Sequence, residues 1–277
     1  MSHPVNANVD IHACELPERG LGLFASRKLS KGLKVMSEVP FLVGETQQDM
    51  VNDIDEEFPL LPLPAQALFT RLFAGSVDMV PVLPAGHDRD QLSVATARLE
   101  QIVQLNSVEG AGTGCFLSPA AAAINHDCVP NTYVYYNHET SLVTLHALRD
   151  IQPNEEVTIN YLHDNIYLDP DQRQQRAFHV PSNDGRGRMR DLRDCLDYYY
   201  QMESPTQDDT LRAISWVREI VELIGEEGQT GLELALCIGE QARLQGILGG
   251  EEGSQATQRR SMIIRRLCLG AEHPSCR

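Results

Sequence analysis

The seven cysteines of this 277-residue chain have neither the number nor the spacing of a disulfide framework or a zinc site. They are odd in number, lie scattered along the chain and form no C-x-x-C pair. Disulfide-stapled folds use an even set of cysteines, and structural zinc sites draw on closely spaced Cys and His ligands. We therefore expect reduced thiols and no bound metal.

Long apolar runs are also missing. No stretch approaches the roughly 20 consecutive apolar residues with which a helix spans a bilayer. Residues 1–10 contain neither the basic region nor the apolar region of a signal peptide. These absences predict a soluble intracellular protein, cytoplasmic or nuclear or both, with no membrane partner.

Positive charge is scarce. The chain has 23 Lys and Arg residues against 39 Asp and Glu residues, which gives a formal net charge of −16. Binding to nucleic acid depends on neutralising phosphates with Lys and Arg, so we expect no direct binding to nucleic acid. A basic acceptor would be tolerated more easily, although acidic surfaces are also common for solubility alone.

Three short motifs follow one another along the chain. The first, RGLGLFASRKLSKGLKVMSEVPFLV at 19–43, places a glycine-containing turn ahead of a strand. The second, NHDCVPN at 125–131, contains a proline after a run of alanines, which is typical of an irregular turn. The third, NEEVTINY at 154–161, alternates apolar and polar residues like a strand with a tyrosine at its far end. Three ordered motifs are far more specific than a glycine pair alone.

Together these motifs resemble those of the SET domain, the family of S-adenosylmethionine-dependent lysine methyltransferases. The resemblance implies S-adenosylmethionine as cofactor, a protein lysine as acceptor, and Tyr161 as the catalytic residue, with its hydroxyl beside the transferred methyl group. It places the methionine part of the cofactor against the backbone of the glycine turn, and the adenine and amino-acid parts against the Asn-His pair. The implied cofactor-binding residues are Gly20, Leu21, Gly22, Leu23, Asn125, His126, Tyr161 and Phe178.

Further aromatic and acidic residues lie close to the motifs. Tyr133 and Tyr135 would line a substrate channel, although an aromatic strand is also typical of simple packing. Phe178 precedes the position of the family's zinc cysteines, where it would stack on adenine or pack in the core. Glu155 and Glu156 occupy adjacent strand positions and face opposite sides, so we expect no shared catalytic role and a structural bond for one of them.

The chain departs from the family after the tyrosine. Many SET enzymes carry C-x-C-x-x-C there, which binds zinc together with the cysteine of the second motif and completes the substrate channel. Residues 173–184 of this chain read RQQRAFHVPSND, so Cys128 lacks those partners, and His179 with Asp184 makes a poor substitute. The departure predicts no zinc.

Keeping the tyrosine without those cysteines leaves three interpretations open. In the first, the chain methylates lysine through a channel completed by its C-terminal helices. In the second, the scaffold binds the cofactor and acts on a small molecule in a biosynthetic pathway. In the third, a catalytically degenerate SET domain is joined to a helical scaffold that recognises a protein partner.

The pattern of apolar residues predicts an α+β fold. We expect a SET domain of short strands at 9–175, with a helical insert at about 46–115, followed by an all-helical C-terminal region at 186–277. Within the insert the pattern predicts an acidic loop and then helices at 66–73 and 92–106.

The C-terminal region shows apolar residues at helical spacing. The run GGEEG at 249–253 predicts a solvated loop between two of these helices. The closing GAEHP at 270–274 resembles a GxxHP motif that ends the helical segment of some fungal SET proteins.

Overall fold

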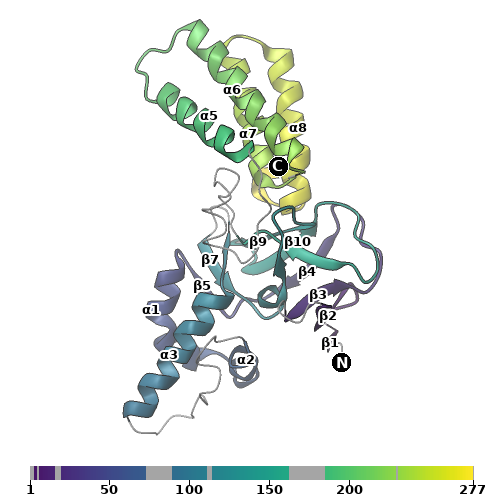
Figure 1. Ribbon diagram of the computed structural model, residues 1–277, viewed down its shortest axis with the longest axis vertical. Helices are drawn as coiled ribbons and strands as arrows, with labels where there is room; N and C mark the ends of the chain where they lie inside the picture. Colours follow the sequence, from purple (N-terminus) through teal and green to yellow (C-terminus); the bar gives the residue numbers. More distant parts are fainter. Residues whose placement is uncertain are drawn as a thin grey trace.

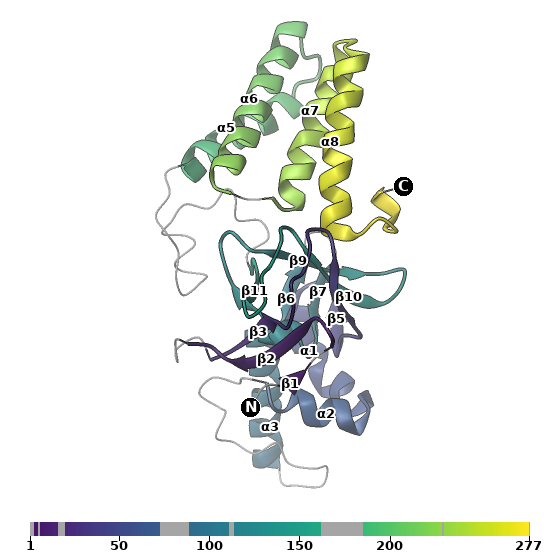
Figure 2. The ribbon, with the colours of Figure 1, turned by 90° about the vertical axis from the view of Figure 1, so that its right-hand side faces the viewer.

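The computed structural model describes residues 3–4, 6–15, 20–72, 89–110, 114–161, 185–228 and 230–276. The strands lie in the middle of the molecule, with one group of helices at each end (Figure 1). Figure 2 shows the same order of parts from the side. The α+β class expected from the sequence is confirmed.

A five-stranded sheet brings the three motifs together. Its strand order is β1-β2-β3-β11-β8, and β11 pairs antiparallel with β3 and parallel with β8. The first motif therefore lies on one side of the third motif, and the second motif lies on the other side. The strands are β1 (His3–Pro4), β2 (Val9–Ala13), β3 (Leu21–Ala25), β8 (Asn125–His126) and β11 (Glu156–Ile159).

A second sheet joins β4 (Lys34–Glu38), β10 (Leu142–Ala147) and β9 (Thr132–Asn137) in that order. The β9–β10 hairpin turns where the Asn137 side chain accepts a hydrogen bond of 2.9 Å from the Glu139 amide. Strand β9 is buried along almost its whole length because one face packs on the sheet core and the other packs on C-terminal helices.

The insert combines helices with a third, small sheet. Its helices share an apolar core with β5 and β7, and the three strands follow the order β5-β7-β6. The elements are β5 (Leu42–Gly44), α1 (Gln47–Glu57), α2 (Leu63–Phe69), α3 (Arg89–Asn106), β6 (Val108–Gly110) and β7 (Gly114–Leu117).

The acidic loop predicted at the start of the insert was wrong, because helix α1 occupies that segment. The Thr46 hydroxyl accepts a hydrogen bond of 3.1 Å from the Asp49 amide, and the Asp49 carboxylate accepts one of 2.9 Å from the Thr46 amide. This reciprocal capping box satisfies two donors at the helix start. Met50, Val51 and Ile54 form the buried stripe, and the acidic side chains lie on the other face.

Four helices form the C-terminal part: α5 (Gly185–Tyr200), α6 (Gln207–Glu226), α7 (Leu232–Ile247) and α8 (Glu251–Leu269). Helices α5, α6 and α7 share an apolar core. The loop predicted at 249–253 was wrong, because α8 begins at Glu251 and only the two glycines before it form the turn. No helix among the described residues is both long and apolar enough to cross a membrane.

The C-terminal helices dock on the second sheet through α8 and the short helix η6 (Pro274–Cys276). The Tyr135 hydroxyl donates a hydrogen bond of 2.7 Å to the Leu269 carbonyl. His146 lies buried in the same place, 6.2 Å from the Tyr135 ring between centroids. Burial, with a contribution from Lys34, lowers the pKa of His146 to about 4, so the ring is neutral near pH 7. The interface therefore depends on polar groups as well as on apolar packing.

Candidate active site

The segment between Asn125 and Asn131 is bound closely to strand β11. The Asp127 amide donates to the Ile159 carbonyl at 2.9 Å. The buried side chain of Asn131 then acts as a strand partner: its oxygen accepts from the Thr158 amide at 2.9 Å, and its nitrogen donates to the Glu156 carbonyl at 2.7 Å. Because this amide satisfies two buried backbone groups, the turn has one fixed position against the strand.

The Asn125 side chain ties all three motifs to one another. Its nitrogen donates to the Leu21 carbonyl at 3.0 Å and to the Glu156 carboxylate at 2.8 Å. The same nitrogen lies 3.3 Å from the Cys14 sulfur. The side-chain nitrogen of Asn125 is therefore engaged by protein groups, and the cofactor-binding role of this residue stays a prediction.

Tyr161 lies directly against the second motif. Its hydroxyl donates a hydrogen bond of 2.6 Å to the Ile124 carbonyl, and its backbone amide donates one of 3.1 Å to His126 Nδ1. The side chain is still 42% exposed. Both ends of the tyrosine are thus held by the segment that begins the second motif, while part of the residue remains exposed to solvent.

The hydrogen bonds of His126 indicate its tautomer. Nδ1 accepts the Tyr161 amide, so the neutral ring carries its proton on Nε2, which lies 3.3 Å from the Cys128 sulfur. His126 therefore connects Tyr161 to Cys128 when it is neutral. A proton on Nδ1 would point at the Tyr161 amide N–H, and the hydrogen bond between His126 and the Tyr161 amide would be lost.

Gly20 and Gly22 of the first motif are needed for different reasons. Gly20 has a φ of +65°, which side-chain-bearing residues rarely adopt, and among the described residues beyond its chain neighbours no heavy atom lies within 4 Å of the place where a Cβ would stand. At Gly22 an added Cβ would lie 2.8 Å from Cys14 Sγ and 2.9 Å from Glu156 Oε1. Gly20 is therefore constrained by its backbone conformation, whereas protein atoms fill the space beside Gly22.

Leu21 and Leu23 complete the first motif with opposite exposure. The Leu21 side chain is 60% exposed, and the Leu23 side chain is fully buried in the sheet core. Any contact between Leu23 and a cofactor would thus involve its backbone. The cofactor-binding roles of these residues stay predictions.

The adjacent glutamates of the third motif have separate partners. Glu156 accepts from Asn125, whereas Glu155 forms an ion pair of 2.6 Å with Arg149 and accepts from the Gln152 amide at 2.8 Å. Burial acts to raise the pKa of Glu155, but the bonds from Gln152 and Arg149 outweigh it and lower the pKa. Both carboxylates hold the structure, where the sequence indicated such a role for one.

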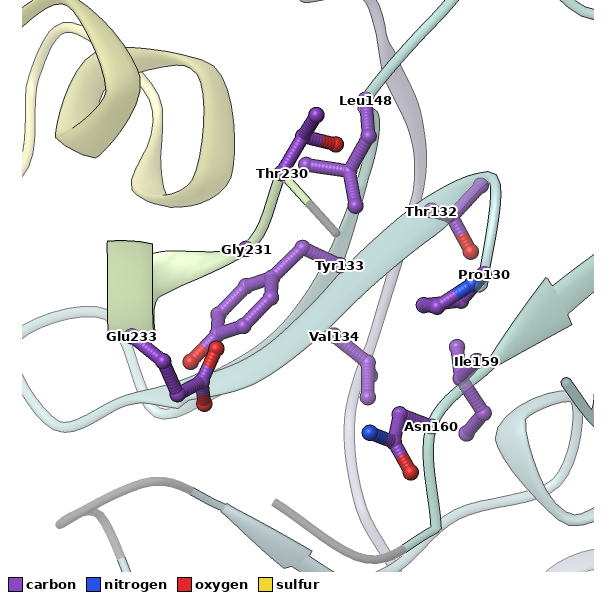
Figure 3. Close-up of a pocket in the computed structure, with 10 residues that line it drawn as sticks. All are labelled: Pro130, Thr132, Tyr133, Val134, Leu148, Ile159, Asn160, Thr230, Gly231 and Glu233. Atoms are coloured by element: carbon purple, nitrogen blue, oxygen red, sulfur yellow. The ribbon is translucent and has the colours of Figure 1, made fainter. Parts of the chain in front are cut away.

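The proposed channel tyrosines are packed in the structure. Tyr135 is 3% exposed and lies at the interface with α8. Tyr133 is 5% exposed and lines a small cavity between β9, the end of β11 and the start of α7, together with Asn160 and Glu233 (Figure 3). The cavity volume of about 20 Å³ has room for roughly one water molecule. A channel role for both tyrosines stays a prediction.

The segment expected to replace the zinc cysteines lies outside the described residues. Phe178, His179 and Asp184 all belong to it. Among the residues that the structure does describe, no three His, Cys, Asp or Glu side chains gather as metal ligands would.

Two groups at the site were not singled out from the sequence. Cys14 lies beside Asn125 and Glu156 because β2 and β3 form a hairpin in which Ala13 faces Leu21. That position was predictable from the hairpin register. The Ile124 carbonyl, which holds the tyrosine hydroxyl, had no signal in the sequence because only the tertiary fold brings it there.

A protein-family model described as the SET domain matches residues 20–162, which is more than half of the chain. The chain belongs to the SET-domain family. The matched residues of this SET-domain protein include the second and third motifs, the first motif from Gly20 onward, and the whole insert.

A curated relative and two solved structures are similar to this SET-domain protein. Histone-lysine N-methyltransferase set5 of Schizosaccharomyces pombe is 28% identical over 148 residues, covering 53% of this chain and 40% of the relative. The chain therefore spans about two fifths of the length of the curated relative it matches. The SET domain of LSMT bound to lysine and AdoHcy is 13% identical, with 99% and 91% of the two chains covered and a TM-score of 0.34. Rubisco LSMT bound to AdoMet is 14% identical, with 96% and 90% covered and a TM-score of 0.33.

Proposed function

We propose that this protein is an S-adenosylmethionine-dependent methyltransferase that transfers a methyl group to a lysine side chain of a protein. The observation that carries the proposal is the position of Tyr161, which is bonded to Ile124 and His126 where the three SET motifs meet. The name of the fission-yeast relative, a histone-lysine methyltransferase, supports a protein lysine as acceptor. The net charge of −16 suits a basic protein partner, in the nucleus or the cytoplasm.

The residues around Tyr161 fit S-adenosylmethionine. The Gly20 backbone has a conformation that favours glycine, the Leu21 side chain is exposed, and Tyr161 is partly exposed to solvent. Asn125 links the turn of Gly20 and Leu21 to the strand that ends at Tyr161. The proposed cofactor-binding set is therefore Gly20, Leu21, Gly22, Leu23, Asn125, His126 and Tyr161, with Phe178 as a further member outside the described residues.

The chemistry of the transfer requires alignment and a neutral amine. The bound cofactor supplies a methyl group on a positively charged sulfur. An acceptor lysine would need a free lone pair on its nitrogen to take up that methyl group, so the amine must first lose its extra proton. A free lysine has a pKa of about 10.4, and a partly desolvated site favours its neutral form. Tyr161, held by its hydroxyl and its amide, orients the amine, and positioning of this kind can supply roughly 7 to 11 kcal/mol.

Calorimetry with S-adenosylmethionine, followed by transfer of a labelled methyl group to basic proteins and peptides, tests the proposal. We expect binding heat and lysine labelling, with labelling lost in Tyr161→Phe while the cofactor still binds. Labelling of a small molecule alone would favour the biosynthetic alternative. Absence of cofactor binding would favour the binding scaffold and overturn the proposal.

The domain boundaries belong to the same proposal. We propose a SET domain at 9–175 with its insert at about 46–115, and a helical region at 186–277 that completes the acceptor side. Contact between the two parts is consistent with this arrangement, since β9, the end of β11 and the start of α7 together line the small cavity.

A further inference from the structure

Glu38 is a partly buried carboxylate of the first motif that has no part in the site contacts described above. It is the last residue of β4, and its side chain reaches the short helical turn η4 (Ala121–Ala123). The carboxylate accepts hydrogen bonds from Ser118 Oγ at 2.7 Å, from the Ala120 amide at 3.0 and 3.1 Å, and from the Ala121 amide at 3.0 Å. Three donors on one short turn thus converge on a single side chain.

No cation compensates this carboxylate among the residues that the structure describes. Burial raises the pKa of Glu38, and the hydrogen bonds from Ser118, Ala120 and Ala121 oppose that effect. Burying a carboxylate without a counter-charge costs free energy of folding, and an apolar side chain at this position would avoid that cost. The arrangement indicates that the position of the turn matters, beyond the stability of the strand.

The turn held by Glu38 ends at the residue that binds the tyrosine hydroxyl. The Ile124 amide donates to the Ala121 carbonyl at 3.1 Å, and the Ile124 carbonyl accepts the Tyr161 hydroxyl at 2.6 Å. Fixing the amides of Ala120 and Ala121 therefore fixes the start of the segment that leads to this carbonyl.

We propose that Glu38 is a positioning residue for Tyr161. Its carboxylate sets the place of the 118–121 turn, and through it the place of the Ile124 carbonyl and the direction of the tyrosine hydroxyl. The effect on methyl transfer rests on the proposed function, whereas the effect on the environment of Tyr161 does not.

Two variants and one control separate this role from a general loss of stability. Glu38→Gln keeps the shape and replaces one acceptor oxygen by an NH₂ group that opposes the amides of the turn. Ser118→Ala keeps the carboxylate and removes one donor, and it carries the test if Glu38→Gln does not fold. Glu45→Gln removes a charge at an exposed position, where no described group pairs with the carboxylate.

The first readout is the NMR signal of isotope-labelled Tyr161, assigned by its loss in Tyr161→Phe. We expect this signal to shift in Glu38→Gln, to shift less in Ser118→Ala and to stay in place in Glu45→Gln. The second readout is kinetic: kcat should fall about 10- to 100-fold in Glu38→Gln, while the KM values and the cofactor Kd stay within about 2-fold. Glu38→Asp, which restores the charge, should recover part of kcat.

Each of these results either supports or overturns the proposed role of Glu38. An unshifted tyrosine signal in both variants overturns the proposal, as does a fall in cofactor affinity equal to the fall in kcat. A shifted signal in a protein whose wild type transfers no methyl group supports the link from Glu38 to Tyr161 and rejects the proposed function alone.

Discussion

The motif-bearing sheet and the C-terminal helices are stabilised in different ways. Around β11, hydrogen bonds from a few side chains fix the positions of the motifs. The Asn131 side-chain amide, for example, bonds two backbone groups of β11. In the helices α5, α6 and α7 apolar side chains fill a shared core, and ion pairs such as Arg188–Glu219 lie exposed, where such pairs contribute little. A change in the sheet should therefore alter function as well as stability, whereas a change in the shared core of these helices should alter stability alone.

The largest expected effect is on catalysis. Tyr161→Phe should lower kcat for methyl transfer about 100- to 10,000-fold, because the hydroxyl that orients the amine is removed. The free energy of unfolding should change by only about 1 kcal/mol, the usual contribution of one hydrogen bond. Transfer of a labelled methyl group and urea unfolding measure the two quantities.

The matched control for this change is Tyr198→Phe, since Tyr198 is 66% exposed on α5. It should leave both quantities unchanged. Equal activity of Tyr161→Phe and the wild type would remove the tyrosine from the mechanism.

A direct contrast comes from two buried residues, one from each region. Asn131→Ala leaves the Thr158 amide and the Glu156 carbonyl unpaired and should lower the free energy of unfolding by about 2 to 4 kcal/mol. Ile238→Ala empties part of the helical core and should cost about 2 to 5 kcal/mol. Urea unfolding measures the stability of both variants, and methyl transfer below the unfolding temperature measures their activity. We expect only Asn131→Ala to lose activity. Equal losses of activity would contradict the contrast between the regions.

The junction of the two regions should be sensitive to acid. His146 is buried at the α8 interface, and its pKa is lowered to about 4 by burial and Lys34. An unfolded histidine binds a proton near pH 6.5, so the neutral ring contributes fully above that pH and its contribution is lost as the pH falls to about 4. The loss should approach about 3 kcal/mol.

Urea unfolding between these pH values measures that dependence. His146→Asn should flatten it, and His138→Asn, at an exposed position, should leave it unchanged. An identical pH dependence in His146→Asn and the wild type would show that protonation of His146 does not affect the stability of the interface.

The smallest expected effect concerns glycine. Gly22→Ala places a Cβ within 2.9 Å of Cys14 and Glu156, so it should lower the free energy of unfolding by about 1 to 3 kcal/mol and weaken cofactor binding. Gly187→Ala meets no atom within 4 Å in helix α5 and should stabilise by about 0.5 to 1 kcal/mol. Thermal unfolding with and without cofactor checks both, and a neutral Gly22→Ala would mean that the site adjusts easily.

The sequence was sufficient to predict the family and the α+β class, because ordered motifs carry that information. The helix at Gln47–Glu57 could have been predicted, since Thr46 and Asp49 have the spacing of a capping box. The many acidic residues of this segment favoured a loop instead. The start of α8 at Glu251 was obscured by its two preceding glycines, although two acids in a first turn favour a helix start.

Other features could not be predicted from local patterns. The parallel pairing of Asn125 and His126 with β11 leaves no periodic signal, and neither does the reach of Glu38 to the 118–121 turn. Strand β9 is buried on both faces, and this can be recognised only when the position of α8 against one face is known. Such contacts depend on tertiary placement and on distant parts of the chain.

Strand β11 sits between partners that are made long before it. Phe24 of β3 faces Glu156, and Asn125 of β8 faces Thr158. On the ribosome, β3 would thus emerge with one flank unpaired until the chain up to β11, which begins at Glu156, has been synthesised. Such long-range pairing slows folding and exposes strand edges to other chains. Nascent protein stalled before residue 156 should therefore be prone to aggregate and should depend on chaperones for its solubility.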